Sequence, residues 1–82
     1  MPPRLKILSA KEVVSIFEEF GFKTLSQRGS HIKLRRATME GLRETLIIPD
    51  HKELDKGTLK AIIRQASKYI PVDSLYPHFY SK

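Results

Sequence analysis

Hydrophobic residues recur at helical spacing in two stretches of the chain and alternate with polar residues in the region between them. The first apolar stripe consists of Val13, Val14, Ile16, Phe17 and Phe20. The second consists of Leu59, Ile62, Ile63, Ala66 and Ile70. Residues three or four positions apart share one face of a helix, and an apolar face buries against a core. The pattern therefore predicts two amphipathic helices.

The first helix has sequence signals at both ends. Ser9-Ala10-Lys11-Glu12 matches a capping box, in which the serine caps the helix and the glutamate returns the hydrogen bond. Gly21 suits the left-handed position that follows many helices, and it allows Phe22 to fold back on Phe17. These signals predict a helix over Ala10–Phe20.

The second helix begins after Asp55, a favourable N-cap residue, and ends by Pro71, which cannot continue a helix. Four cations recur every four residues on a different face from the apolar stripe, and these are Lys56, Lys60, Arg64 and Lys68. Such a stripe is either an ordinary solvated helix surface or a track for phosphate groups.

Three β-compatible segments lie between the helices, and these are Phe22–Arg28, His31–Arg36 and Arg43–Ile48. Gly29-Ser30 predicts a tight turn or a bulge between the first two. Ala37–Leu42 contains a glycine and predicts an exposed hairpin loop before the third. Hairpin-linked strands form an antiparallel meander, which has one covered and one open face.

The order helix, three strands, helix predicts an α+β fold, a two-layer sandwich whose helices cover one face of a three-stranded antiparallel sheet. A chain of 82 residues is long enough for one domain, 1–82, with its core in residues 9–70. We expect the basic leader Met1–Ile7 to be loosely held. Residues 71–82 form a short C-terminal tail rich in aromatic residues, which we expect to pack on its own domain or on a partner.

The charge of the chain narrows the classes of partner. The formal net charge is +6, which favours polyanions such as nucleic acid but also serves solubility.

The chain has no cysteine, which excludes disulfides and thiolate metal sites. Because it has neither an apolar run of membrane-spanning length nor a signal peptide, we expect a cytoplasmic protein without membrane contact.

The strand that begins at His31 places an imidazole among cations. If Ile32 and Leu34 face the core, His31 shares the open face with the cations of its own strand and of the preceding strand end. These cations are Lys33, Arg35 and Arg28. Histidine titrates near neutral pH, so it can act as general acid or base, while the cations bind phosphate. The competing interpretation is an ordinary surface histidine.

Other candidate residues are weaker. His51 follows the third strand in a loop, where it either binds phosphate, acts as a complementary acid or caps the loop. His78 has no supporting pattern. Three scattered histidines lack metal-ligand spacing, so we expect no metal and no cofactor.

Several of these segments together resemble the HicA-type toxins, a family of mRNA interferases. The matching stretches are Gly21-Phe22, Gln27-Arg28-Gly29-Ser30-His31, Ile48-Pro49-Asp50-His51-Lys52-Glu53-Leu54, Asp55-Lys56-Gly57-Thr58-Leu59 and Ile62-Ile63-Arg64-Gln65-Ala66. The resemblance covers roughly Ser9 to Ile70, with the stretches in order and correctly separated.

The resemblance implies a fold like a double-stranded-RNA-binding domain and cleavage of mRNA by the histidine of the Gly-Ser-His motif, here His31. It also implies a HicB-type antitoxin that covers this histidine. The tail after Pro71 departs from the family pattern and could serve antitoxin binding or formation of a homodimer.

We therefore expect a metal-independent endoribonuclease, with His31 catalytic and with Arg28, Lys33, Arg35 and His51 binding RNA phosphates. One alternative is a non-catalytic RNA-binding module that docks on an A-form helix by shape and phosphate contacts. Another is a protein-interaction domain whose charge is incidental.

Overall fold

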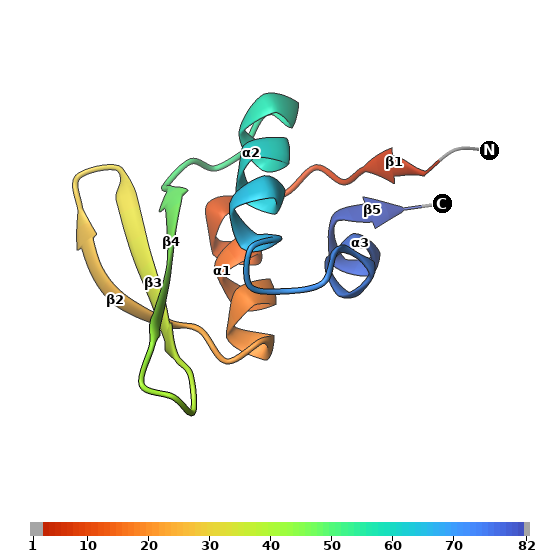
Figure 1. Cartoon of the computed structure of the whole chain (residues 1–82). Helices are drawn as coiled ribbons and strands as arrows, with labels where there is room; N and C mark the ends of the chain where they lie inside the picture. Colours follow the sequence, from red (N-terminus) through yellow and green to blue (C-terminus); the bar gives the residue numbers. More distant parts are fainter. Residues whose placement is uncertain (1–2, 82) are drawn as a thin grey trace.

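The computed structural model describes residues 3–81 and has an α+β architecture. The elements in chain order are β1 (Arg4–Leu5), α1 (Ala10–Glu19), β2 (Lys23–Arg28), β3 (His31–Ala37), β4 (Arg43–Pro49), α2 (Lys56–Ala66), α3 (Val72–Phe79) and β5 (Tyr80–Ser81). The strands β2, β3 and β4 form an antiparallel sheet in that order. Helices α1 and α2 lie on one side of this sheet (Figure 1). The predicted two-layer α-β-β-β-α core is confirmed and is compatible with a fold like a double-stranded-RNA-binding domain.

The capping signals of α1 form the predicted contacts. Ser9 Oγ accepts from the Glu12 N–H at 3.1 Å, and Glu12 Oε1 accepts from the Ser9 N–H at 2.9 Å, which completes the capping box. Gly21 adopts a φ of 94°, and the Phe22 N–H donates to the Phe17 carbonyl, as in a Schellman motif. The rings of Phe17 and Phe22 then meet edge to face, with centroids 5.9 Å apart.

The second helix begins where its sequence indicates. Asp55 Oδ1 accepts a 2.7 Å hydrogen bond from the Thr58 N–H, and α2 ends at Ala66, five residues before Pro71. The stripe predicted to be apolar is buried throughout, whereas the four cations of the other stripe are exposed.

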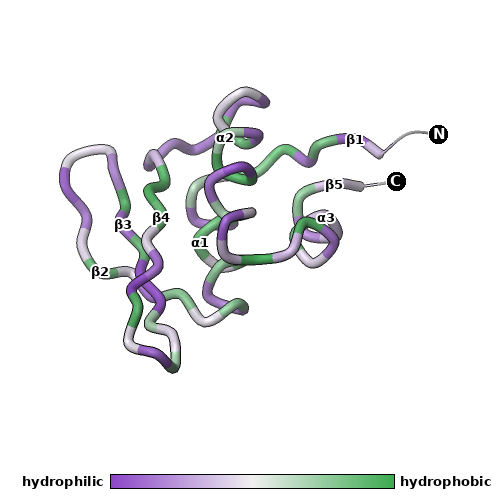
Figure 2. Tube along the Cα trace, in the orientation of Figure 1, coloured by the Kyte–Doolittle hydropathy of each residue, from purple (hydrophilic) through white to green (hydrophobic). Residues whose placement is uncertain are grey.

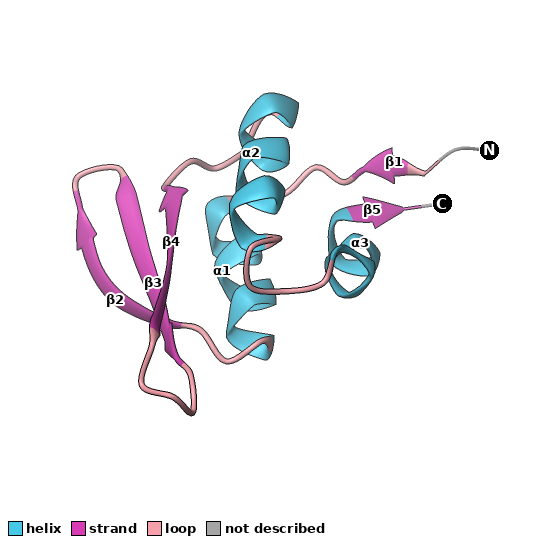
Figure 3. Cartoon of the chain, viewed as in Figure 1, coloured by secondary structure: helices cyan, strands magenta, loops and turns pink. Residues whose placement is uncertain are grey.

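Hydropathy alternates along the first part of β3 (Figure 2), whereas β4 changes from polar to apolar residues along its length. Ile32 and Leu34 of β3 and Leu46 and Ile48 of β4 point toward the helices and are buried. Strand β2 is exposed along its whole length, so the sheet extends beyond the helices that cover it (Figure 3). One face of the sheet therefore carries the core, and the other carries polar side chains.

The expectation of a loosely held leader is wrong for Arg4–Leu5. These residues pair antiparallel with Tyr80–Ser81, and the two strands together are called the terminal ribbon here. The partners lie at opposite ends of the chain, so no local pattern reveals the pairing. Residues 1, 2 and 82, which the predicted leader and tail include, lie outside the described residues.

The tail packs on its own domain, as one of the two predicted alternatives states. Residues Val72–Phe79 form α3, a helix that the sequence analysis did not predict, with Leu75 and Phe79 buried. The Phe79 ring lies against Phe17 of α1, with centroids 5.8 Å apart. Within residues 3–81, no helix has the length and apolar run that a bilayer crossing requires.

Candidate functional site

His31 is the first residue of β3, the central strand of the three-stranded sheet. The two-residue turn before it has Gly29 at a φ of 54°, and Ser30 does not have a positive φ. Glycine at the first central position favours a type II′ turn, whose twist suits a tight hairpin. The register sets His31 opposite Arg28 of β2 on one side and Pro49 of β4 on the other.

The imidazole lies on the open face, in a pocket of about 400 Å³ that is called the His31 pocket here. Its lining residues come from all three strands and are Ser26, Arg28, His31, Lys33 and Ile47. His31 is exposed and is not packed beneath the helices. Residues paired across strands share a face, so Ser26 and Ile47 flank Lys33 just as Arg28 flanks His31.

The electrostatic character of the His31 pocket is positive. Arg28 and Lys33 contribute cationic groups, and none of the described lining residues is acidic. Opposite charges a few ångströms apart attract more strongly near a protein surface than in bulk water. The pocket can therefore hold an anion beside a group that exchanges protons.

Arg35 lies on the same face but does not line the His31 pocket. It pairs with Lys23 of β2 and Thr45 of β4, two residues further along β3 than Lys33. Its Nε is buried and has no hydrogen-bond partner among residues 3–81. Arg35 is thus an extension of the cationic row rather than a neighbour of the imidazole.

His51 lies in the loop after β4 and lines a different pocket, of about 400 Å³, with Ser9, Lys11, Asp50 and Lys52. Its carbonyl accepts from the Ala10 N–H at the start of α1, at 3.0 Å. The Asp50 N–H donates to the Ser30 carbonyl beside the β2–β3 turn. The loop is therefore fixed at the same end of the sheet as His31, but the structure does not bring His51 into the His31 pocket.

The sequence analysis missed two residues of the His31 pocket. Ile47 is 38% exposed although Leu46 and Ile48 are buried, because it points to the open face. Successive side chains of a strand point to opposite faces, so an inward Leu46 and Ile48 already imply an outward Ile47. Ser26 had no such signal, because a register shift between Thr24 and Ser26 decides which β2 residues face outward.

Within residues 3–81, no group of three or more histidine, cysteine, aspartate or glutamate side chains is arranged to hold a metal ion. His31 and His51 lie in separate pockets. Among the described lining residues, Asp50 beside His51 is the one further side chain of a type that commonly binds metals.

Comparison with protein-family models matches residues 10–67 to a family described as HicA toxin of bacterial toxin-antitoxin. The matched segment starts with α1, contains the whole three-stranded sheet and the His31 pocket, and ends just after α2. Neither the comparison with curated proteins nor that with solved structures gives a match. The match covers well over half of the chain, so the protein belongs to the HicA toxin family of bacterial toxin–antitoxin systems.

Proposed function

We propose that this toxin is an endoribonuclease that cleaves mRNA, with His31 as its catalytic histidine. The observation that carries the proposal is the exposed imidazole in a pocket that also contains Arg28 and Lys33. This combination supports chemistry on a phosphodiester, which needs proton transfer and positive charge at the same place.

The proposed reaction uses the RNA's own 2′-hydroxyl as nucleophile. Its oxygen forms a bond to the adjacent phosphorus while the bond from phosphorus to the 5′-oxygen of the next nucleotide breaks. The 2′-hydroxyl proton passes to a base, and the leaving 5′-oxygen takes a proton from an acid. The products are a 2′,3′-cyclic phosphate and a 5′-hydroxyl, and His31 supplies one of the two proton transfers.

The cations have a separate role in this proposal. Negative charge accumulates on the non-bridging phosphate oxygens in the transition state, and Arg28 and Lys33 line the pocket where these oxygens would lie. Arg35 extends the positive row along β3 for a neighbouring phosphate. His51, in its own pocket beside Lys11 and Lys52, would contact a further part of the RNA backbone.

We also propose a HicB-type antitoxin as the protein partner. A toxin–antitoxin toxin requires an antitoxin, and covering the open sheet face would exclude RNA from His31. Self-association of the toxin within such a complex stays a prediction. An mRNA substrate would place the action of the toxin in the cytoplasm.

The test compares wild type with His31→Ala on purified RNA in excess chelator. Wild type should cleave the RNA and leave cyclic phosphate ends, and His31→Ala should lose at least 100-fold in rate, the lower end of positioned acid–base catalysis. His78→Gln is the matched control. His78 lies in α3, where its ring meets the Phe20 ring, and it does not line the His31 pocket. Cleavage that chelator abolishes would contradict the metal-independent mechanism.

One observation favours the alternative of a non-catalytic RNA-binding module. Only one histidine is among the described residues that line the His31 pocket, so the second proton-transfer group is not evident. In that case wild type and His31→Ala would bind RNA equally, neither would cleave it, and the substitution would hardly affect growth.

A further inference from the structure

A second cationic pocket is lined by residues of the terminal ribbon and of α2. The terminal ribbon lies on the side of the helices away from the three-stranded sheet (Figure 1). The pocket measures about 550 Å³ and is called the ribbon pocket here. Its lining residues are Pro3, Arg4, Leu5, Ile7, Lys56, Lys60 and Tyr80. None of them takes part in the proposed cleavage chemistry.

The ribbon pocket concentrates positive charge. Lys56 and Lys60 lie one turn apart on α2, so their Cβ atoms are about 5–6 Å apart. Arg4 contributes a third cation from the terminal ribbon, and none of the described lining residues is acidic. The ion pair described within residues 3–81 joins Arg36 and Glu44, so the three cations have no carboxylate partner there. Like charges at this spacing repel, and a bound anion would relieve that repulsion.

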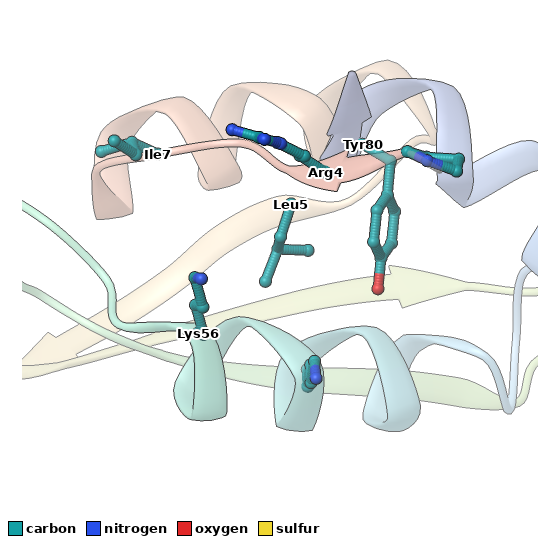
Figure 4. A pocket seen from close by; sticks show the side chains of 7 residues that line it. Arg4, Leu5, Ile7, Lys56 and Tyr80 are labelled. Carbon is teal, nitrogen blue, oxygen red and sulfur yellow. The ribbon is translucent and has the colours of Figure 1, made fainter. Parts of the chain in front are cut away.

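The wall opposite the lysines is apolar and aromatic. In Figure 4, Leu5 and Tyr80 extend from the terminal ribbon toward α2, and Lys56 extends from α2 toward the ribbon. The Tyr80 ring also packs against the Tyr76 ring, with centroids 4.7 Å apart and an interplanar angle of 39°, which limits its freedom. An aromatic ring beside cations suits a nucleotide, because the base or ribose packs on the ring while the phosphate meets the ammonium groups.

The two ends of the chain complete this pocket. Arg4 and Tyr80 lie outside the segment that matches the HicA family, whereas Lys56 and Lys60 lie inside it. Pairing of Leu5 with Tyr80 in the terminal ribbon holds both side chains over α2. The ribbon pocket therefore combines residues from inside and outside the segment that the family model matches.

We propose that the ribbon pocket binds backbone phosphates of single-stranded RNA and holds part of the RNA away from His31. This inference rests on the proposed function in taking RNA as the ligand. The loop from Asp50 to Asp55 connects the two sites, since it leads from the end of β4, beside His31, to the start of α2, where Lys56 lies. Lys52 lies within this loop and lines the His51 pocket, so it supplies a cation between the two sites.

The test measures equilibrium binding of a single-stranded 2′-O-methyl RNA at several salt concentrations. This RNA has no free 2′-hydroxyl, so it cannot be cleaved by the proposed reaction. The variant is Lys56→Ala/Lys60→Ala, and the matched control is Arg64→Ala/Lys68→Ala, which removes the same charge from exposed positions outside the pocket. Each lost phosphate contact lowers the salt slope by about 0.7 for single strands, so the pocket variant should lower it by about 1.4. Its affinity at low salt should fall about tenfold, and the control should change by less than twofold.

A second variant tests the aromatic wall. Tyr80→Leu keeps the net charge and should weaken RNA binding severalfold while leaving the salt slope unchanged. If the two double-alanine variants lose RNA affinity equally, the proposed binding site is wrong, and RNA binds the positive charge of the helix without preference for the ribbon pocket. Weaker binding of the purified antitoxin with unchanged RNA affinity would overturn RNA as the occupant.

The binding readout separates this inference from the proposed function. If the pocket variant lowers the salt slope while no RNA is cleaved by wild type, the ribbon pocket stands and the nuclease proposal fails. If His31 is required for cleavage but the pocket variant binds RNA as wild type does, the ribbon pocket alone fails.

Discussion

The Arg36 Nε donates a 2.7 Å hydrogen bond to Glu44 Oε1 across the β3–β4 pair, with both side chains largely shielded from solvent. The same guanidinium donates to the Phe20 carbonyl at 2.8 Å and to the Tyr69 carbonyl at 3.3 Å. It also lies over the Phe22 ring, 4.9 Å from its centroid. One side chain thus connects the sheet to the end of α1 and to the turn that follows α2.

Replacing Arg36 with methionine should destabilise the fold by about 2 kcal/mol, because Glu44 and two carbonyl groups lose a charged donor in a partly buried place. Urea unfolding would measure the loss. Arg43→Met is the control, since Arg43 is exposed, and it should stay within about 0.5 kcal/mol of wild type. Arg36→Lys should recover little of the lost stability, because an ammonium group cannot reproduce the planar set of N–H donors of the guanidinium. Equal effects at Arg36 and Arg43 would contradict this structural role.

The Gln65 side chain closes part of the free edge of β4. Its Oε1 accepts from the Ile47 N–H at 2.9 Å, and its Nε2 donates to the Ile47 carbonyl at 3.4 Å. Gln65→Leu should speed amide hydrogen exchange of Ile47 and cost about 1 kcal/mol, since the edge groups lose both partners. Leu46 in the same spectra serves as the reference. Unchanged exchange at Ile47 would show that the two hydrogen bonds from the Gln65 side chain do not protect this strand edge.

Phe79 joins the tail to the core. It is fully buried against Phe17, so Phe79→Ala should cost about 3–5 kcal/mol in the free energy of unfolding through lost burial and a cavity. Val72→Ala, in the same helix but 41% exposed, should cost less than about 0.5 kcal/mol. A small effect at Phe79 would mean that α3 is dispensable for the fold.

Asp55 contributes to the pH dependence of the protein's stability. Hydrogen bonds from the side chain and backbone of Thr58 lower the pKa of Asp55 below its ordinary value of 3.8. A carboxyl with a lower pKa in the folded state binds protons less readily there, so its contribution is complete above pH 3.8 and is lost as the pH falls through the folded pKa. Asp55→Asn keeps the N-cap acceptor but cannot titrate. Its stability, measured by urea unfolding from pH 5 to pH 2.5, should therefore fall less steeply below pH 4 than that of wild type.

His51 should matter for binding rather than for the chemical step, because it lines a pocket separate from that of His31. His51→Ala should raise KM for RNA cleavage severalfold and leave kcat within about twofold, the pattern of a contact made equally in the ground and transition states. A drop in kcat as large as that of His31→Ala would instead make His51 the second proton-transfer group.

Much of the fold follows from local signals that the sequence carries in full. The capping box at Ser9, the glycine at position 21 and the N-cap at Asp55 involve residues within a few positions of one another, so their hydrogen bonds need no distant partner. Alternation along β3 likewise fixed that Ile32 and Leu34 face inward and that His31 and Lys33 share the outer face. The same alternation singled out His31 among cations as the candidate for chemistry, and the family resemblance then implied its catalytic role.

The tertiary structure decided what depends on contacts between distant residues. The register shift in β2 set Ser26 opposite Lys33, and the fixed loop after β4 kept His51 out of the His31 pocket. Pairing of Leu5 with Tyr80 created the terminal ribbon and its cationic pocket. Periodicity along a chain reports which way each side chain points, but it carries no information on which distant segments meet, because that choice depends on the packing of the whole core.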